Sequence, residues 1–150
     1  MKKENVHVLL VEDDEGHALL VRENLRRHGV INKIHTVSDG QMALDYIFHK
    51  GEFADKNKAP RPGLILLDLN LPKVSGFEIL RQLKMKEETK IIPVIILTST
   101  ADQREIDKSY ELGANNYITK PVDYKEFQNK LHNLGLFLEI VSYPEKGSTL

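Results

Sequence analysis

The stretch Leu64-Ile65-Leu66-Leu67-Asp68 consists of four consecutive large aliphatic residues followed directly by a carboxylate. A run that is apolar at every position is typical of a strand buried on both faces of a parallel sheet. In open α/β sheets, ligands bind at the carboxyl ends of such strands. The stretch therefore predicts a central strand and places a functional site at its end, where Asp68 stands alone.

Four other segments have the character of strands. Residues 6–11 and 93–97 are continuous apolar runs, and residues 116–119 form a weaker one. Residues 33–37 alternate between apolar and polar side chains, which favours a position nearer an edge of the sheet. Together with the central run, these segments predict five strands.

Helix signals lie between the strands. Four pairs have capping-box spacing or its aspartate variant: Ser38 with Gln41, Ser75 with Glu78, Asp102 with Glu105, and Asp123 with Glu126. Gly29 and Gly113 stand where helix C-caps are expected. The last helix carries a core stripe of Phe127, Leu131, Leu134 and Leu138. Repeated strand–helix units predict an α/β fold, a doubly wound parallel sheet with helices on both faces.

Length and composition limit the classes of protein to which this chain can belong. The 150 residues suit one domain, with a core over about residues 5–140 and a C-terminal extension over 141–150. The 21 basic and 22 acidic residues give a net charge of −1, which favours neither nucleic acid nor a membrane surface as a partner. The absence of cysteine excludes disulfides and thiolate sites. No segment resembles a secretory signal or a membrane span, so we expect a cytoplasmic protein.

The strand ends supply a distinctive set of side chains. The first strand is followed by three acids, the third by Asp68, the fourth by two hydroxyls, and the fifth by a lysine and a proline: Glu12, Asp13, Asp14, Thr98, Ser99, Lys120 and Pro121. Clustered carboxylates repel one another unless a cation lies between them. Oxygen ligands suit Mg²⁺, whereas the lack of cysteine and of paired histidines disfavours zinc.

A metal ion, a carboxylate nucleophile, a hydroxyl and a lysine together indicate phosphoryl transfer. Asp68 is the predicted nucleophile, with Lys120 and the metal stabilising the developing charge and Thr98 binding a phosphoryl oxygen. Some members of the set have simpler explanations. Asp14 is equally well explained as a helix N-cap, and Thr98 taken alone is more often structural.

These motifs resemble the CheY-like response-regulator receiver family over nearly the whole chain. The segments that carry the resemblance are Val8-Leu-Leu-Val-Glu12-Asp13-Asp14, Leu66-Leu-Asp68-Leu-Asn70-Leu-Pro72, Gly76, Ile96-Leu-Thr98-Ser99, and Gly113-Ala-Asn-Asn-Tyr117-Ile-Thr-Lys120-Pro121. The resemblance implies a flavodoxin-like fold with strand order 2-1-3-4-5. It also implies a phosphoacceptor signalling protein rather than an enzyme with turnover.

The resemblance assigns a role to each matching residue. Asp68 would accept a phosphoryl group from a sensor histidine kinase. Mg²⁺ would be bound by Glu12, Asp13, Asp68 and the backbone carbonyl of Asn70. Thr98 and Lys120 would bind the phosphoryl group, and Tyr117 would move inward as the coupled aromatic switch. The bond between Lys120 and Pro121 would be cis. Asp14, Ser99 and Pro121 are possible accessory residues, and Ser99 departs from the alanine that the family often has there.

Three features resemble the phytochrome-associated single-domain regulators: the long loop over residues 49–63, the segment Leu69-Asn-Leu-Pro-Lys73, and an extended last helix. This similarity implies a phytochrome-type kinase as partner and a homodimer through the fourth and fifth helices. We expect no effector domain, so that output would be a change in the surface that binds a downstream protein. A terminal effector, a phosphorelay shuttle and a phosphate sink all remain open.

Two other classes fit the sequence less well. An aspartate-nucleophile phosphatase of the haloacid dehalogenase type needs a second acid two positions after the nucleophile, where this chain has Asn70. A nucleotide- or flavin-binding module needs a glycine-rich phosphate loop, and the chain contains neither G-x-G-x-x-G nor GK[ST].

Overall fold

The five predicted strands form one parallel sheet in the computed structural model, which describes residues 6–30, 32–99 and 102–133. The strands are β1 (His7–Val11), β2 (Ile34–Val37), β3 (Pro62–Asp68), β4 (Val94–Thr98) and β5 (Asn116–Thr119). Their order is β2-β1-β3-β4-β5, and all four pairings are parallel. The predicted fold class and strand order are confirmed, and the more polar segment is the edge strand β2.

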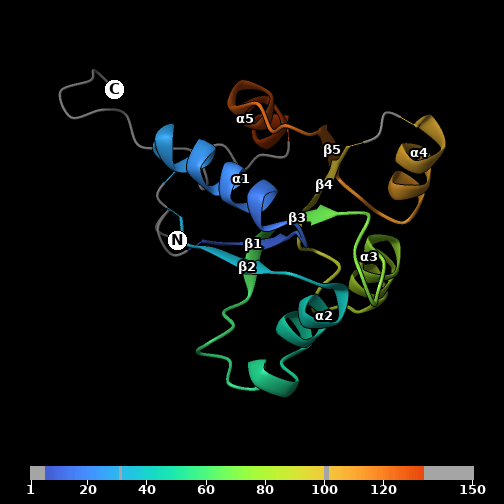
Figure 1. The fold of residues 1–150 in the computed structure, drawn as a ribbon. Coiled ribbons are helices and arrows are strands. Elements are labelled where there is room, and N and C mark those ends of the chain that lie inside the picture. The colour runs from blue at the N-terminus through green and yellow to red at the C-terminus, as the bar shows by residue number, and fades with distance from the viewer. Residues whose placement is uncertain (1–5, 31, 100–101, 134–150) are drawn as a thin grey trace.

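Helices cover both faces of this sheet (Figure 1). They are α1 (Glu15–Arg27), α2 (Gly40–Phe48), α3 (Gly76–Met85), α4 (Gln103–Glu111) and α5 (Tyr124–Asn133). The buried side chains of α1 and α5 pack in one hydrophobic cluster, and those of α2 and α3 pack in another. The sheet separates the two clusters, as a doubly wound fold requires.

The central strand β3 contributes to both clusters. Leu64 and Leu66 face α1 and α5, whereas Ile65 and Leu67 face α2 and α3. All four side chains are fully buried, and burial of each contributes roughly 1.5–3 kcal/mol. The end of β3, which carries Asp68, is therefore anchored from both sides of the sheet.

Three of the four predicted capping positions are confirmed. Ser75, Asp102 and Asp123 accept hydrogen bonds from backbone N–H groups in the first turns of α3, α4 and α5. The prediction for α2 was wrong, because Asp39 is the N-cap and accepts from the Met42 N–H at 2.8 Å. Asp39 lies one residue closer to the helix than Ser38, and its carboxylate is an equally suitable cap.

Both predicted C-cap glycines are confirmed by left-handed backbone angles. Gly29 has φ of 85° and Gly113 has φ of 107°, and they directly follow His28 and Leu112, the C-cap residues of α1 and α4. An L side chain in this region is strained, so glycine is the residue expected at such a helix end.

The long loop before β3 contains regular structure and buried contacts. β3 begins at Pro62, two residues before the predicted apolar run, and a 3-10 turn (η2, Gly51–Phe53) lies within the loop. The Tyr46 hydroxyl donates to the Pro60 carbonyl at 2.9 Å, and Ala59 is fully buried. The loop is thus held against α2 along part of its length.

Some predictions concern residues outside those described. Leu134, Leu138 and the extension over residues 141–150 belong to this group, whereas Phe127 and Leu131 are fully buried as predicted. Within residues 6–30, 32–99 and 102–133, no helix combines the length and the apolar character needed to cross a membrane.

A histidine pair between β1 and β2 makes stability depend on pH. His7 Nδ1 lies 2.9 Å from His35 Nε2, and burial lowers the pKa of both imidazoles, with Lys33 lowering them further. Because the folded state favours the neutral rings, their contribution to stability is present above the unfolded pKa of about 6.5 and is lost as pH falls below it. We expect the urea concentration at the unfolding midpoint to decrease when the pH is lowered from 7.5 to 5.5. The decrease should be smaller in His35→Gln.

The matched control for this prediction is His132→Gln, at an exposed histidine of α5. It should keep the pH dependence of the wild type. Equal pH dependence in the wild type and in His35→Gln would show that the pair does not contribute.

Candidate functional site

Two carboxylates meet at the ends of the neighbouring strands β1 and β3. The strands are parallel, with Val11 opposite Leu67. Glu12 and Asp68 are the next residues on each side, so both lie at the same edge of the sheet. Their side chains are only 1% and 7% exposed. The register of the sheet thus places two carboxylates together in a nearly buried position.

The Lys120 ammonium joins the two carboxylates. Its Nζ lies 2.7 and 2.9 Å from the two oxygens of Glu12 and 2.8 Å from Oδ2 of Asp68. These contacts match the three hydrogens of an ammonium group. The bond between Lys120 and Pro121 is cis, as the resemblance implied.

The three groups shift one another's pKa values. Burial and the adjacent Asp68 raise the pKa of Glu12 to about 8, against the opposing effect of Lys120. Burial alone would raise the pKa of Asp68, but the hydrogen bonds with Glu12 and Lys120 lower it below its usual value. Burial would lower the pKa of Lys120, but the hydrogen bonds to the carboxylates raise it. The site therefore favours a charged Asp68 beside a charged Lys120.

Asp13 completes a set of oxygen ligands. Glu12, Asp13 and Asp68 each offer one carboxylate oxygen, and these oxygens lie within 4.8 Å of one another. Asp13 is exposed, so the group opens to solvent on its side. Such a donor set fits a hard divalent cation, with waters or phosphate oxygens as further ligands. The structure thus brings together the three carboxylates of the predicted Mg²⁺ site.

The connection between β3 and α3 fixes the second oxygen of Asp68. The Asn70 backbone N–H donates to Asp68 Oδ1 at 3.0 Å. Gly76, the first residue of α3, donates its N–H to the Leu69 carbonyl, and a Cβ there would lie 2.5 Å from the Asp68 carbonyl oxygen. Glycine allows α3 to begin this close to the end of β3. The role of the Asn70 carbonyl as a metal ligand stays a prediction.

The remaining predicted residues lie around this centre in different environments. Thr98 ends β4 and is fully buried, whereas Ser99 after it is exposed. Asp14 is the N-cap of α1 and accepts from the His17 N–H at 2.9 Å, which agrees with the simpler explanation of this residue. The half-buried Tyr117 ring lies edge-on to Tyr110, with centroids 6.2 Å apart.

His17 belongs to the site, although no sequence pattern predicted a role for a histidine. Its Nδ1 lies 3.1 Å from Glu12 Oε1 and 3.5 Å from Lys120 Nζ. The available signal was its position three residues after Asp14, in the first turn of a helix that begins beside the acidic motif. That signal requires knowing that Asp14 is the N-cap.

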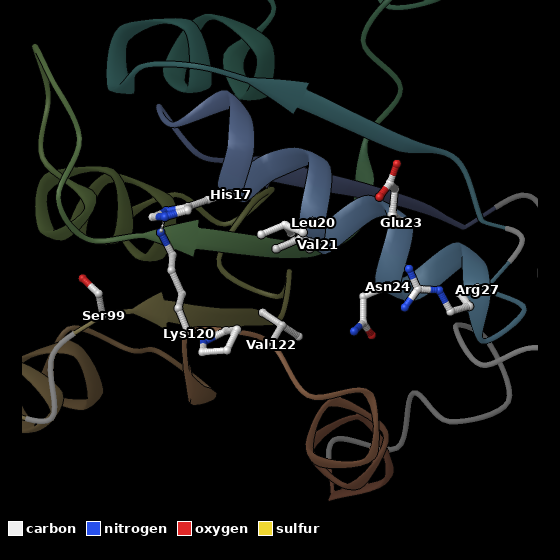
Figure 2. A pocket seen from close by; sticks show the side chains of 10 residues that line it. His17, Leu20, Val21, Glu23, Asn24, Arg27, Ser99, Lys120 and Val122 are labelled. Carbon is white, nitrogen blue, oxygen red and sulfur yellow. Dashed lines mark hydrogen bonds between the residues drawn. The ribbon is translucent and has the colours of Figure 1, made fainter.

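A groove of about 380 Å³ extends from the site along α1 (Figure 2). Lys120 and His17 lie at one end, and Leu20, Val21 and Val122 provide an apolar wall. Leu20 is 61% exposed. The other lining residues are Glu23, Asn24, Arg27, Ser99 and Pro121. No pattern in the sequence predicted this groove.

The family model of the response regulator receiver domain matches residues 8–132. The chain belongs to the response regulator receiver family. The match spans the five strands and five helices except for His7, the first residue of β1, and Asn133, the last residue of α5. The acidic group, Asp68 and Lys120 lie within the matched residues, so the site described above is part of a receiver domain.

Individual relatives include regulators linked by name to phytochromes. The receiver is 37% identical to response regulator Rcp1 of Synechocystis sp. (strain ATCC 27184 / PCC 6803 / Kazusa) over 91% of this chain and 92% of that protein. It is similar in structure to the bacteriophytochrome response regulator AtBRR, with a TM-score of 0.82, 33% identity, and coverage of 94% and 98%. The phosphorylated cyanobacterial phytochrome response regulator RcpA gives a TM-score of 0.74 and 38% identity, with coverage of 89% and 94%.

Proposed function

We propose that this receiver accepts a phosphoryl group on Asp68 from the phosphohistidine of a sensor kinase, with Mg²⁺ bound by Glu12, Asp13 and Asp68. The observation that carries the proposal is the position of Lys120 Nζ, 2.8 Å from Asp68 Oδ2, beside three carboxylate oxygens suited to a cation. Among the relatives, RcpA has been crystallised in a phosphorylated form and Rcp1 with Mn²⁺ bound.

In this mechanism a carboxylate oxygen of Asp68 forms a bond to phosphorus, and the bond between phosphorus and the donor imidazole breaks. The imidazole leaves with the electron pair of that bond. Lys120 stabilises the charge that develops on the phosphoryl oxygens, while the Asn70 N–H orients the Asp68 carboxylate. A divalent cation held by Glu12, Asp13 and Asp68 would supply further charge stabilisation. Thr98, at the end of the adjacent strand β4, is the proposed hydroxyl ligand of the phosphoryl group.

The direct test uses acetyl phosphate as donor and intact mass as readout. The wild type should gain one phosphoryl group in the presence of Mg²⁺ and none in EDTA. Asp68→Asn should gain none, because an amide cannot replace the carboxylate as the nucleophile that attacks phosphorus. Asp107→Asn, on the exposed surface of α4, is the matched control and should be labelled normally. Equal labelling of Asp68→Asn and the wild type would exclude Asp68 as the acceptor.

The proposed donor is a histidine kinase of the phytochrome type. Support comes from AtBRR and RcpA, two structurally similar regulators that are named for phytochromes. The test is phosphotransfer from a purified phytochrome kinase, compared with transfer from an unrelated sensor kinase at equal concentration. Faster transfer from the unrelated kinase would contradict the assignment.

The groove along α1 gives a separate prediction for the kinase. A protein donor must bring its phosphohistidine to Asp68, and the exposed Leu20 lies in the groove that leads away from Lys120. We expect Leu20→Asp to slow phosphotransfer from the kinase roughly tenfold, because an apolar side chain within an interface carries binding energy of this order. Labelling by acetyl phosphate should be unchanged.

The control for this prediction is Met85→Asp, at a 68% exposed apolar residue at the end of α3. It should leave both rates unchanged. An equal slowing by Leu20→Asp with both donors would show an effect on the site itself and not on docking.

We further propose that output passes through the surface around Tyr117. This ring on β5 lies edge-on to Tyr110 of α4 and within 5.0 Å of Lys130 Nζ of α5, so three elements meet there. A shift of Tyr117 after phosphorylation would change this surface, which is the proposed homodimer or effector face. Size-exclusion elution with and without beryllofluoride tests dimerisation. A phosphorelay shuttle is distinguished by transfer of the phosphoryl group onward to a second histidine protein.

A further inference from the structure

One imidazole at the site has no part in the mechanism above. His17 lies in the first turn of α1, and its ring faces the Lys120 ammonium in Figure 2. Although half of the His17 side chain is exposed, Nδ1 lies 3.1 Å from an oxygen of Glu12, whose side chain is 1% exposed. A surface imidazole is thus directed at a buried carboxylate of the cation-binding group.

The backbone holds His17 in this position. Its N–H donates to Asp14 Oδ1 at 2.9 Å as part of the N-cap of α1, and its Nε2 lies 4.0 Å from Asp14 Oδ2. When Glu12 is ionised, its oxygens can only accept hydrogen bonds. The proton of a neutral His17 must then be on Nδ1 for this contact to be a hydrogen bond.

The three contacts of Lys120 create a need for a second donor. Two of them are to Glu12 and one is to Asp68, so all three ammonium hydrogens are directed at carboxylates. To bind an oxygen of a phosphoryl group on Asp68, Lys120 must release at least one of them. When the released contact is one of the two to Glu12, the carboxylate oxygen that loses its donor lies in a nearly buried position. Loss of a hydrogen-bond donor is unfavourable there.

We propose that His17 is a positioning residue that holds the Glu12 carboxylate in its metal-binding orientation while Lys120 turns to the phosphoryl group. Its Nδ1–H is already within hydrogen-bond distance of Oε1, the same oxygen that Lys120 contacts at 2.7 Å. His17 therefore acts through Glu12 and does not touch the transferred group. This inference rests on the proposed function, since it assigns a partner to one of the proposed Mg²⁺ ligands.

The test compares His17→Leu with His17→Asn. Leucine removes the donor, whereas the asparagine amide can present an N–H near the position of Nδ1. Residues that orient a metal ligand typically change metal affinity or activity by 10–100-fold when they are replaced. We expect His17→Leu to weaken Mg²⁺ binding, measured by calorimetry, and to slow acetyl phosphate labelling at saturating Mg²⁺, each about tenfold. His17→Asn should stay within about threefold of the wild type for both.

His132→Leu, at an exposed histidine on α5, is the control and should match the wild type in both assays. A Mg²⁺ affinity and a labelling rate for His17→Leu within twofold of the wild type would overturn the proposal. Equal defects in the asparagine and leucine variants would also overturn it, because the donor would then not matter. If the wild type binds Mg²⁺ but is not labelled at Asp68, the proposed function fails, and the calorimetric comparison still decides the role of His17.

Discussion

Replacing Lys120 with methionine is expected to slow labelling of Asp68 by acetyl phosphate about 100-fold or more. The ammonium lies 2.8 Å from Asp68 Oδ2, at the position where charge develops on the transferred group. Loss of one preorganised donor to such charge typically lowers the rate by this order. Methionine keeps the length and much of the volume of the side chain, so packing around the β5–α5 connection should change little. The measurement is the rate of mass gain at saturating Mg²⁺.

The same substitution should lower stability in EDTA. Lys120 and Asp68 form a nearly buried ion pair, and removal of one partner from such a pair costs about 3 kcal/mol, because a charge stays buried without its counterion. Mg²⁺ should therefore raise the free energy of unfolding more in Lys120→Met than in the wild type. The measurement is urea unfolding in EDTA and in Mg²⁺.

The exposed pair of Lys90 and Glu87 provides the matched control. Lys90→Met should change stability by less than about 0.5 kcal/mol and leave labelling unchanged, because surface ion pairs contribute little. A labelling rate for Lys120→Met within threefold of the wild type would contradict the role given to the ammonium.

The sequence predicted the sheet and its site because both depend on strong local patterns. The continuous run that ends at Asp68 is typical of a strand buried on both faces, and parallel strands bring their carboxyl ends to one edge. Glu12 and Lys120 directly follow β1 and β5, and Asp68 is the last residue of β3. Their convergence in space therefore follows from the topology, without knowledge of side-chain positions.

The features that the sequence did not predict depend on details finer than this pattern. Asp39 caps α2 in place of Ser38, because a shift of one residue decides which side chain meets the free N–H groups. The contact of His17 with Glu12 depends on the direction in which α1 leaves the first strand, which the N-cap Asp14 sets. The groove beside Leu20 depends on the packing of α1 against the connection after Lys120, which are distant in the sequence.

Replacing Gly76 with alanine should destabilise the fold by about 3 kcal/mol. An added Cβ would lie 2.5 Å from the carbonyl oxygen of Asp68 and 2.7 Å from Cα of Leu69. Both neighbours are backbone atoms at the end of the fully buried strand β3, so neither can move aside by rotating a side chain. Either the start of α3 or the end of β3 must shift.

This shift should also slow the phosphorylation of Asp68, because Gly76 packs against the segment that holds Asp68 and Asn70. We expect Gly76→Ala to be labelled by acetyl phosphate more slowly than the wild type, even at a temperature where urea unfolding shows that the variant is folded. Gly16→Ala provides the comparison, since its Cβ would meet only the side chain of Asp14, at 3.2 Å, near the exposed start of α1. Alanine is also favoured over glycine in a helix, so its net effect should stay within about 1 kcal/mol of the wild type. A folded Gly76→Ala variant with normal labelling would show that the end of β3 tolerates displacement, and that Asp68 is positioned mainly by its hydrogen bonds to Lys120 and Asn70.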